Sequence, residues 1–320
     1  MKTLYPPVSA GLQLATGRLL AAIAVALLVS PAVAQLANPK PESKTVKSKA
    51  ATEPTVGSDW VRLELDEAGK PRSMQTAIVR YKSKTDPGVA VDLVGAVHVG
   101  DKAYYEDLNE RFKQYDALLY ELVAPDGTVV EPGRGTSSRH PLGALQNGMK
   151  DMLQLEHQLE QIDYTCPNFV HADMSPEVFF KSMKNRDESF AKMYFRMIGT
   201  SLAYQSRMTA QGESADVDIL KAIMSDDRPR QLKIALAKQM ADMESMLSAF
   251  GGEEGSTLIT ERNKKALEVL KKQLDDGKKK IGIFYGAGHL NDMHQRLENE
   301  FKLHPAEITW LPAWKLSAEE

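Results

Sequence analysis

The feature of this sequence that most constrains its fold is a set of short apolar runs that alternate with amphipathic segments. The runs are rich in Val, Ile and Leu, which is typical of strands that are covered on both faces. Buried strands are predicted at Val89–Val97, Ala117–Val123 and Lys280–Tyr285, and shorter strands at Asn168–Asp173 and Glu307–Leu311. Since helical segments separate these runs, we expect an α/β fold with a mostly parallel sheet and flanking helices.

Two further regions complete the predicted architecture. Trp60–Leu65 and Met74–Tyr81 roughly alternate apolar and polar residues around a Gly-Lys-Pro turn, which predicts an N-terminal antiparallel β-hairpin. The middle of the chain, about residues 141–256, predicts a helical insertion subdomain. The expected helices are Asp101–Tyr115, Leu142–Ile162, a largely helical stretch from Ser175 to Phe250, Thr257–Leu274 and Asn291–Phe301.

The first 34 residues have the pattern of a secretory signal peptide. The uncharged run Leu19–Val29 is followed by Ala32 and Ala34, small residues at positions −3 and −1 of a cut after Ala34. The run is shorter than the ~20 residues of a spanning helix. We therefore expect an exported protein with no transmembrane segment in its mature chain; the alternative is an uncleaved membrane anchor. Residues 35–57 predict a disordered linker, which leaves 58–320 as the folded domain.

Charge and cysteine content exclude several classes of protein. The 320 residues include 40 Lys and Arg against 43 Asp and Glu, a formal charge of −3, so no basic field favours nucleic-acid binding. Cys166 is the only cysteine, which excludes an intramolecular disulfide or a cysteine-rich zinc fold. A peptide or small-molecule substrate remains as the expected partner.

Two tetrapeptides recur in the same predicted context. Gly95-Ala96-Val97-His98 and Gly286-Ala287-Gly288-His289 each lie at the carboxyl end of a buried strand, just before an expected helix N-cap at Asp101 or Asn291. This edge of a parallel sheet is where ligands bind. Glycine permits close backbone approach, and histidine offers a ring nitrogen to a metal or a proton.

An acidic residue lies at the end of the strand between these motifs. Glu121 interrupts an apolar run, so its carboxylate must be paired, coordinated or shifted in pKa. His98, Glu121 and His289 could form a two-histidine, one-carboxylate site for Zn, Mn, Co or Fe, to which His171 or Asp173 could add. The alternative is that the histidines are structural and cap turns.

These motifs resemble the TraB/GumN/Tiki superfamily, whose members carry two GxxH motifs, a Glu after the first and an E-R-N helix before the second. Here Glu261-Arg262-Asn263 supplies the E-R-N sequence, and the resemblance covers about residues 89–123 and 257–311. It implies His98, Glu121, Arg262 and His289 as the site. Tiki-like members are described as metal-dependent proteases, and more distant relatives include a haem-binding lipoprotein and an erythromycin esterase. Ala96 departs from the Thr that often follows the first Gly.

The E-R-N helix also has a physical reason to contribute. Asn263 falls on the apolar stripe of its helix, so its amide needs partners in the core. Arg262 could hold Glu121 or stabilise a developing oxyanion; the alternative is a solvated side chain in a charged helix.

Two functions from different classes follow. The first is an exported metal-dependent hydrolase, most simply a peptidase, with Glu121 as ligand or general base. The second is a non-catalytic protein that binds haem, a metal or a signalling peptide on the same scaffold. A third reading, a structural envelope protein, requires the two histidines to lie far apart.

Overall fold

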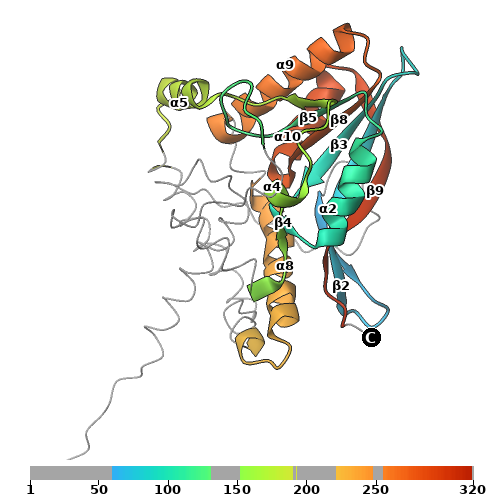
Figure 1. Cartoon of the computed structure of the whole chain (residues 1–320), viewed down its shortest axis with the longest axis vertical. Coiled ribbons are helices and arrows are strands. Elements are labelled where there is room, and N and C mark those ends of the chain that lie inside the picture. The colour runs from blue at the N-terminus through green and yellow to red at the C-terminus, as the bar shows by residue number, and fades with distance from the viewer. Residues whose placement is uncertain (1–59, 131–151, 190–191, 193–220, 248–254, 319–320) are drawn as a thin grey trace, which may run out of the picture.

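A computed structural model describes residues 60–130, 152–189, 192, 221–247 and 255–318 (Figure 1). The predicted signal peptide and linker lie outside the described residues. Only part of the predicted insertion, on either side of residues 193–220, lies within them.

The core of the fold is a mixed seven-stranded sheet with flanking helices, which confirms the predicted α/β class (Figure 1). β2 pairs antiparallel with β1, β3 and β9, while β3, β8, β5 and β7 pair in parallel, so every strand except β2 runs in one direction. The strands are β1 (Val61–Leu65), β2 (Pro71–Ser83), β3 (Ala90–Ala96), β5 (Ala117–Tyr120), β7 (Phe169–His171), β8 (Lys280–Gly286) and β9 (Leu303–Lys315).

The predicted N-terminal hairpin is confirmed. β1 pairs antiparallel with β2, with Val61 opposite Thr76, and the turn between them is closed by the Gly69 N–H, which donates to the Asp66 carbonyl. β2 is much longer than β1, and its other edge carries β9 along almost its full length. The C-terminal strand β9 is therefore paired with the N-terminal hairpin, although the two are far apart in the sequence.

The order of the parallel strands decides where the two GxxH motifs lie. β8 is inserted between β3 and β5, with Ala96 beside Gly286 and Tyr120 beside Phe284. The carboxyl end of β8 therefore lies between the ends of the strands that precede His98 and Glu121. Gly282 is needed in the middle of β8, because an added Cβ would lie 2.5 Å from the Leu118 side chain.

Six described helices surround the sheet, and several predicted boundaries were wrong. α10 begins directly at the end of β8, so Asn291 is inside the helix and Gly286 holds the N-cap position. Asp101 holds the predicted N-cap position of α2, although its carboxylate binds Lys233 Nζ at 2.8 Å and makes no cap hydrogen bond. The helices are α2 (Lys102–Phe112), α4 (Gln158–Gln161), α5 (Pro176–Asn185), α8 (Arg228–Leu247), α9 (Arg262–Asp275) and α10 (Ala287–Asn299).

Two predicted helices differ in kind from the prediction. The helix expected at Thr257–Leu274 opens with a π-helical turn, η1 (Thr257–Glu261), before α9 begins at Arg262. The described end of the helix expected at Leu142–Ile162 contains a two-residue strand, β6 (Glu156–His157), which pairs with β4 (Val99–Gly100). Tertiary pairing with the chain that follows His98 has here overridden the local helical pattern.

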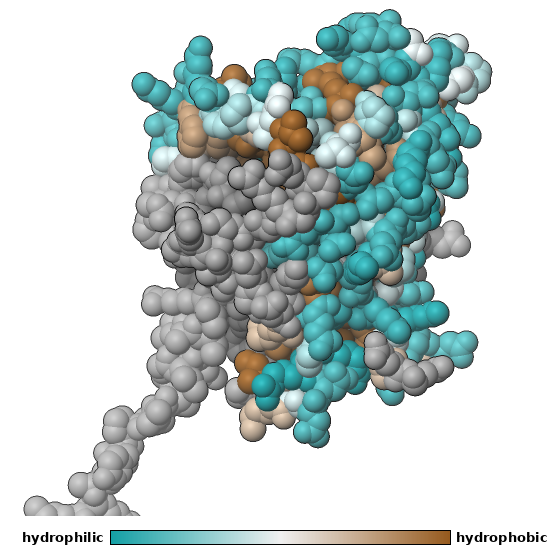
Figure 2. Space-filling view, viewed as in Figure 1, coloured by the Kyte–Doolittle hydropathy of each residue, from teal (hydrophilic) through white to brown (hydrophobic). Residues whose placement is uncertain are grey.

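Polar residues dominate the face of the molecule shown in Figure 2. The apolar side chains gather in one main cluster on both sides of the sheet, which includes Trp60, Tyr105 and Trp314. Among the described residues, no helix has the length and hydropathy to cross a bilayer.

Candidate functional site

The residues predicted to form a site lie together at the carboxyl edge of the sheet. His98 follows β3, Glu121 directly follows β5, Gly286 ends β8, and Asp173 comes two residues after β7. Because these four strands are parallel and adjacent, their ends meet at one edge, as the Val-rich runs predict.

Arg262 is the centre of this site. Its Nε donates to Asp173 Oδ1 at 2.9 Å and its Nη2 to Asp173 Oδ2 at 2.5 Å, a bidentate pair. The same Nη2 donates to Glu121 Oε1 at 2.7 Å. The Arg262 side chain is only 3% exposed, and that of Asp173 is fully buried. The solvated arginine that the charged helix suggested is therefore wrong, and Arg262 joins two carboxylates from different strands.

Glu121 is held as an ionised carboxylate. Its Oε2 accepts a hydrogen bond of 2.7 Å from the Gly286 N–H at the N-terminus of α10, where the helix dipole favours negative charge. Burial alone would raise the pKa of Glu121, but the positive charge of Arg262, helped by the Gly286 N–H, holds that pKa well below its usual value. Glu121 is consequently a weak base and a strong source of negative charge.

His289 lies in the first turn of α10 with a fixed tautomer. Its Nδ1 is 2.7 Å from Asn263 Oδ1, while Asn263 Nδ2 donates to the His289 carbonyl and to Asp292 Oδ2, both at 2.9 Å. Since Asn263 presents its oxygen, Nδ1 carries the proton and Nε2 keeps a lone pair. That Nε2 lies 3.6 Å from Glu121 Oε1 and 3.5 Å from Arg262 Nη1. Burial lowers the pKa of His289 to about 4, against the opposing charge of Glu121, so the ring is neutral near pH 7.

The other predicted residues divide into two groups. His98 is half-buried at the same edge and contributes electrostatically to Glu121. His171 points elsewhere, because its Nε2 bonds the Leu122 carbonyl at 2.6 Å and its Nδ1 lies 3.7 Å from the exposed Asp126. The structure therefore brings together Glu121, Asp173, Arg262, Asn263, Gly286 and His289, with His98 beside them, and leaves His171 outside the cluster.

The two glycines that open the motifs have different roles. An added Cβ at Gly286 would lie 3.3 Å from Glu121 Oε2, so this glycine allows the carboxylate to approach the helix N-terminus closely. At Gly95 the added atom would meet the Ala77 carbonyl at 3.1 Å and Leu290 at 3.4 Å, both packed core atoms. Gly95 therefore serves packing of the sheet against α10.

Sequence reasoning missed three polar residues that complete the site. The buried Tyr285 hydroxyl donates to the Ala172 carbonyl at 2.6 Å, beside Asp173. Asp292 orients the amide of Asn263, and Gln158 donates its backbone N–H to the His98 carbonyl at 2.9 Å. The Asp292 position could have been found from its i+3 spacing to His289, but Gln158 lies in a region with no recognisable motif.

The donor set at the edge of the sheet is partly suited to a divalent metal. The His289 Nε2 lone pair and Glu121 Oε1 are separated by a distance that fits two ligands of one ion, and Asn263 orients the ring through its hydrogen bond to Nδ1. Yet no group of three or more His, Cys, Asp or Glu side chains among the described residues forms a metal-binding arrangement as it stands. A metal here would use His98 as its third protein ligand and would share Glu121 with Arg262.

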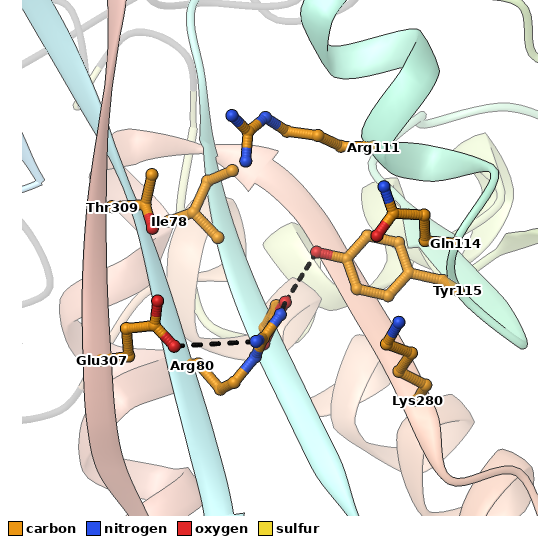
Figure 3. A pocket seen from close by; sticks show the side chains of 9 residues that line it. Ile78, Arg80, Arg111, Gln114, Tyr115, Lys280, Glu307 and Thr309 are labelled. Carbon is orange, nitrogen blue, oxygen red and sulfur yellow. Dashed lines mark hydrogen bonds and ion pairs between the residues drawn. The ribbon is translucent and has the colours of Figure 1, made fainter.

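A separate open pocket of about 150 Å³ lies at the opposite, amino-terminal end of the parallel strands (Figure 3). Arg80 forms a bidentate pair with the buried Asp92, and the Tyr115 hydroxyl donates to the same carboxylate at 2.8 Å. Glu307 lies 3.7 Å from Arg80 on its other side. Arg80 therefore lies between two carboxylates in an ion-pair network that links β2, β3 and β9, and we assign the chemistry to the other edge.

Comparison with known proteins identifies no relative of this protein. No protein-family model matches the sequence, no curated protein matches it, and no solved structure matches the fold. The resemblance to the TraB/GumN/Tiki superfamily therefore stays a prediction that depends on the motifs alone.

Proposed function

We propose that the protein is a hydrolase that cleaves peptide bonds at the site formed by His98, Glu121, Arg262 and His289. The observation that carries the proposal is the His289 imidazole, whose proton is fixed on Nδ1 by Asn263 and whose Nε2 faces Glu121. Each of these polar groups would be costly to bury alone. A neutral imidazole buried beside an ionised carboxylate and a guanidinium is therefore typical of an active site.

Each residue of the site has a distinct task in this proposal. Arg262 holds Glu121 in place and presents Nη1 toward His289, where it stabilises negative charge that develops on a substrate carbonyl. Asp173 fixes the plane of the guanidinium through its bidentate pair. Asn263 keeps the imidazole in the tautomer that leaves Nε2 without a proton.

A divalent metal, Mn, Co, Zn or Fe, fits the ligand chemistry of His98, Glu121 and His289. Such an ion supplies Lewis acidity and a bound water of lowered pKa. Glu121 and His289 already have the deprotonated forms that metal ligands require, and the low basicity of both favours the role of ligand over that of a general base.

The test is hydrolysis of a mixed peptide library by the purified protein, read by mass spectrometry with and without each of the four metals. We expect a divalent metal to induce cleavage, and His98→Gln, Glu121→Gln and His289→Gln each to reduce it at least about a hundredfold. His304→Gln, on β9 and outside the site, is the matched control and should retain full activity. Unchanged activity in all three site variants would refute the proposed site.

A non-catalytic binding protein for haem, a metal or a signalling peptide is the second candidate. One observation favours it: both oxygens of Glu121 are already engaged, by Arg262 and by Gly286. Ala96, where a hydroxyl is common in the resembled family, agrees with it. Metal uptake or a Soret band on haem titration, without cleavage of any library peptide, would support this candidate over the hydrolase.

Export is proposed as the cellular context. Residues 1–34 have the composition and cut site of a signal peptide. Sequencing the N-terminus of the protein recovered from its native cells should give Gln35.

A further inference from the structure

An ion pair on α10 lies directly behind the proposed active site and connects it to the surface. Arg296 Nε donates to Asp292 Oδ2 at 2.8 Å, and Arg296 Nη1 donates to Glu300 Oε1 at the same distance. Asp292 Oδ2 also accepts from Asn263 Nδ2 at 2.9 Å. Because Asn263 bonds the His289 ring, a continuous chain of hydrogen bonds leads from the exposed Glu300 to the imidazole.

The spacing of Asp292 and Arg296 is that of an ordinary ion pair on a helix surface, but the surroundings of the pair are different. Asp107 and Arg111 form the same pair on α2, with Nε 3.0 Å from Oδ2 and with side chains that are 44% and 39% exposed. The side chains of Asp292 and Arg296 are 29% and 19% exposed. Asp292 also bonds the fully buried amide of Asn263, and this bond links the α10 pair to the site.

The orientation of the Asn263 amide decides which nitrogen of His289 carries the proton. With Oδ1 toward the ring, Nδ1 must donate and Nε2 keeps its lone pair. A rotated amide would turn its NH₂ group toward Nδ1 and require the proton on Nε2. The neighbours of Nε2 do not decide between the two forms, because Arg262 Nη1 at 3.5 Å favours a lone pair there and Glu121 Oε1 at 3.6 Å favours a proton.

Two acceptors hold the amide in the observed orientation. The His289 carbonyl and Asp292 Oδ2 each lie 2.9 Å from Asn263 Nδ2, and rotation would place Oδ1 against both of them. The His289 carbonyl lies inside α10, where it also accepts within the helix. Asp292 offers a carboxylate, and hydrogen bonds to charged groups are the stronger ones. Asp292 is therefore the main restraint on the amide, and Arg296 keeps the accepting oxygen in place.

We infer that Asp292, held by Arg296, is a positioning residue that keeps the proton of His289 on Nδ1 through the Asn263 amide. The carboxylate acts on the imidazole without touching it. Only a nitrogen without a proton can bind a metal ion, so the value of this control for metal binding rests on the proposed function. The control of the tautomer itself does not.

The experiment determines the tautomer of His289 in the full-length protein, without added metal, from the NMR chemical shifts of the two ring nitrogens, which are assigned with His289→Gln. We expect the wild type to carry the proton on Nδ1 alone. Asp292→Leu leaves the His289 carbonyl as the remaining restraint on the amide. The preference for the Nδ1 proton should then fall to about fivefold, the equivalent of one net hydrogen bond, so that about one sixth of the protein carries the proton on Nε2. Asp292→Asn keeps an acceptor oxygen beside Arg296 and should restore the wild-type tautomer.

Matched variants separate this role from the loss of a helix ion pair. Asp107→Leu removes the corresponding pair from α2 and should leave the His289 tautomer unchanged. Asp292→Ala repeats the test with a small side chain of high helix propensity, which keeps the result decisive if Asp292→Leu does not fold. The inference is overturned by a mixture of tautomers in the wild type, by an Nδ1 proton that is fully retained in the folded Asp292 variants, or by an equal shift in Asp107→Leu.

Failure of this inference is distinguishable from failure of the proposed function. A tautomer shift in Asp292→Leu, in a protein that cleaves no library peptide, would keep the positioning role and reject the hydrolase. Peptide cleavage by the wild type, with the same His289 tautomer in Asp292→Leu, would do the reverse.

Discussion

Arg262 is the residue on which the electrostatics of the site depend. It is the common partner of Asp173 and Glu121, two carboxylates that are almost completely buried. Removing one member of a buried ionic cluster leaves the remaining charges without compensation, which typically costs about 3–5 kcal/mol. We predict that Arg262→Met lowers the free energy of unfolding by about this amount, measured by urea denaturation.

The control for this variant is Arg72→Met, which makes the same substitution at a side chain that is 66% exposed and 3.8 Å from Glu64. An exposed pair of this kind contributes at most about 1 kcal/mol. If Arg262→Met were as stable as Arg72→Met, the two carboxylates would have to be protonated or hydrated in the wild type, and the site described above would be wrong.

At the same scale, sequence reasoning found residues whose type conflicts with their neighbours. Glu121 was found because it interrupts an apolar run, and Asn263 because an amide falls on an apolar stripe. Gln158 could not be found this way, because it reaches the site through its backbone N–H, which donates to the His98 carbonyl.

At the scale of elements, the π-helical turn η1 sets the position of Arg262 at the start of α9. π-helical turns are rare and often occur at functional sites. Gly255 precedes this turn with φ of +69°, and an added Cβ would lie 2.5 Å from Thr260 Oγ1, inside the turn itself. Ser256 caps the turn by accepting from the Ile259 N–H.

Gly255→Ala should therefore destabilise the protein through both backbone strain and overlap, by about 2–4 kcal/mol. Gly69→Ala is the matched control, because Gly69 has φ of +74° and nothing within 4 Å of the added atom. It should cost only about 1 kcal/mol, the strain part alone. Equal losses in urea denaturation would show that the contact with Thr260 relaxes freely, and η1 would not be a rigid support for Arg262.

The elements that the sequence predicted well are those in which apolar residues recur with a clear period. The Val-rich strands and the amphipathic α5 occur where expected, with Ser175 as N-cap of the latter. η1 and the two-residue pair β4 and β6 were missed, because neither is long enough to impose a period on the sequence.

At the scale of the whole molecule, the strand order was not predictable from local patterns. The insertion of β8 between β3 and β5 joins segments more than 150 residues apart, and it is this insertion that brings His289 to Glu121. The sequence located the ends of the strands and the edge they share, but the neighbours in the sheet depend on packing of the complete chain.

The C-terminal strand β9 connects the whole fold back to the first GxxH motif. The indole Nε1 of the buried Trp314 donates to the Val99 carbonyl at 2.8 Å, one residue after His98, and the Asp101 N–H donates to the Ala313 carbonyl at 2.8 Å. The last strand therefore fixes the segment that carries His98, although nothing in its sequence indicates a role in the site.

Trp314→Phe tests this connection, because it keeps an aromatic ring in the core and removes the donor to Val99. The Val99 carbonyl is then left unpaired in a buried position, and we predict a loss of about 1–3 kcal/mol in the free energy of unfolding, together with weaker metal binding through His98.

Trp310→Phe provides the control on the same strand. The buried Nε1 of Trp310 has no partner among the described residues. Its ring contacts Arg62 at 4.1 Å, and phenylalanine retains part of this contact. Removing an unpaired N–H should cost about 1 kcal/mol or less. A larger loss in Trp310→Phe than in Trp314→Phe would mean that ring size and not the bond to Val99 determines the contribution of β9, and the C-terminus would then have no specific link to His98.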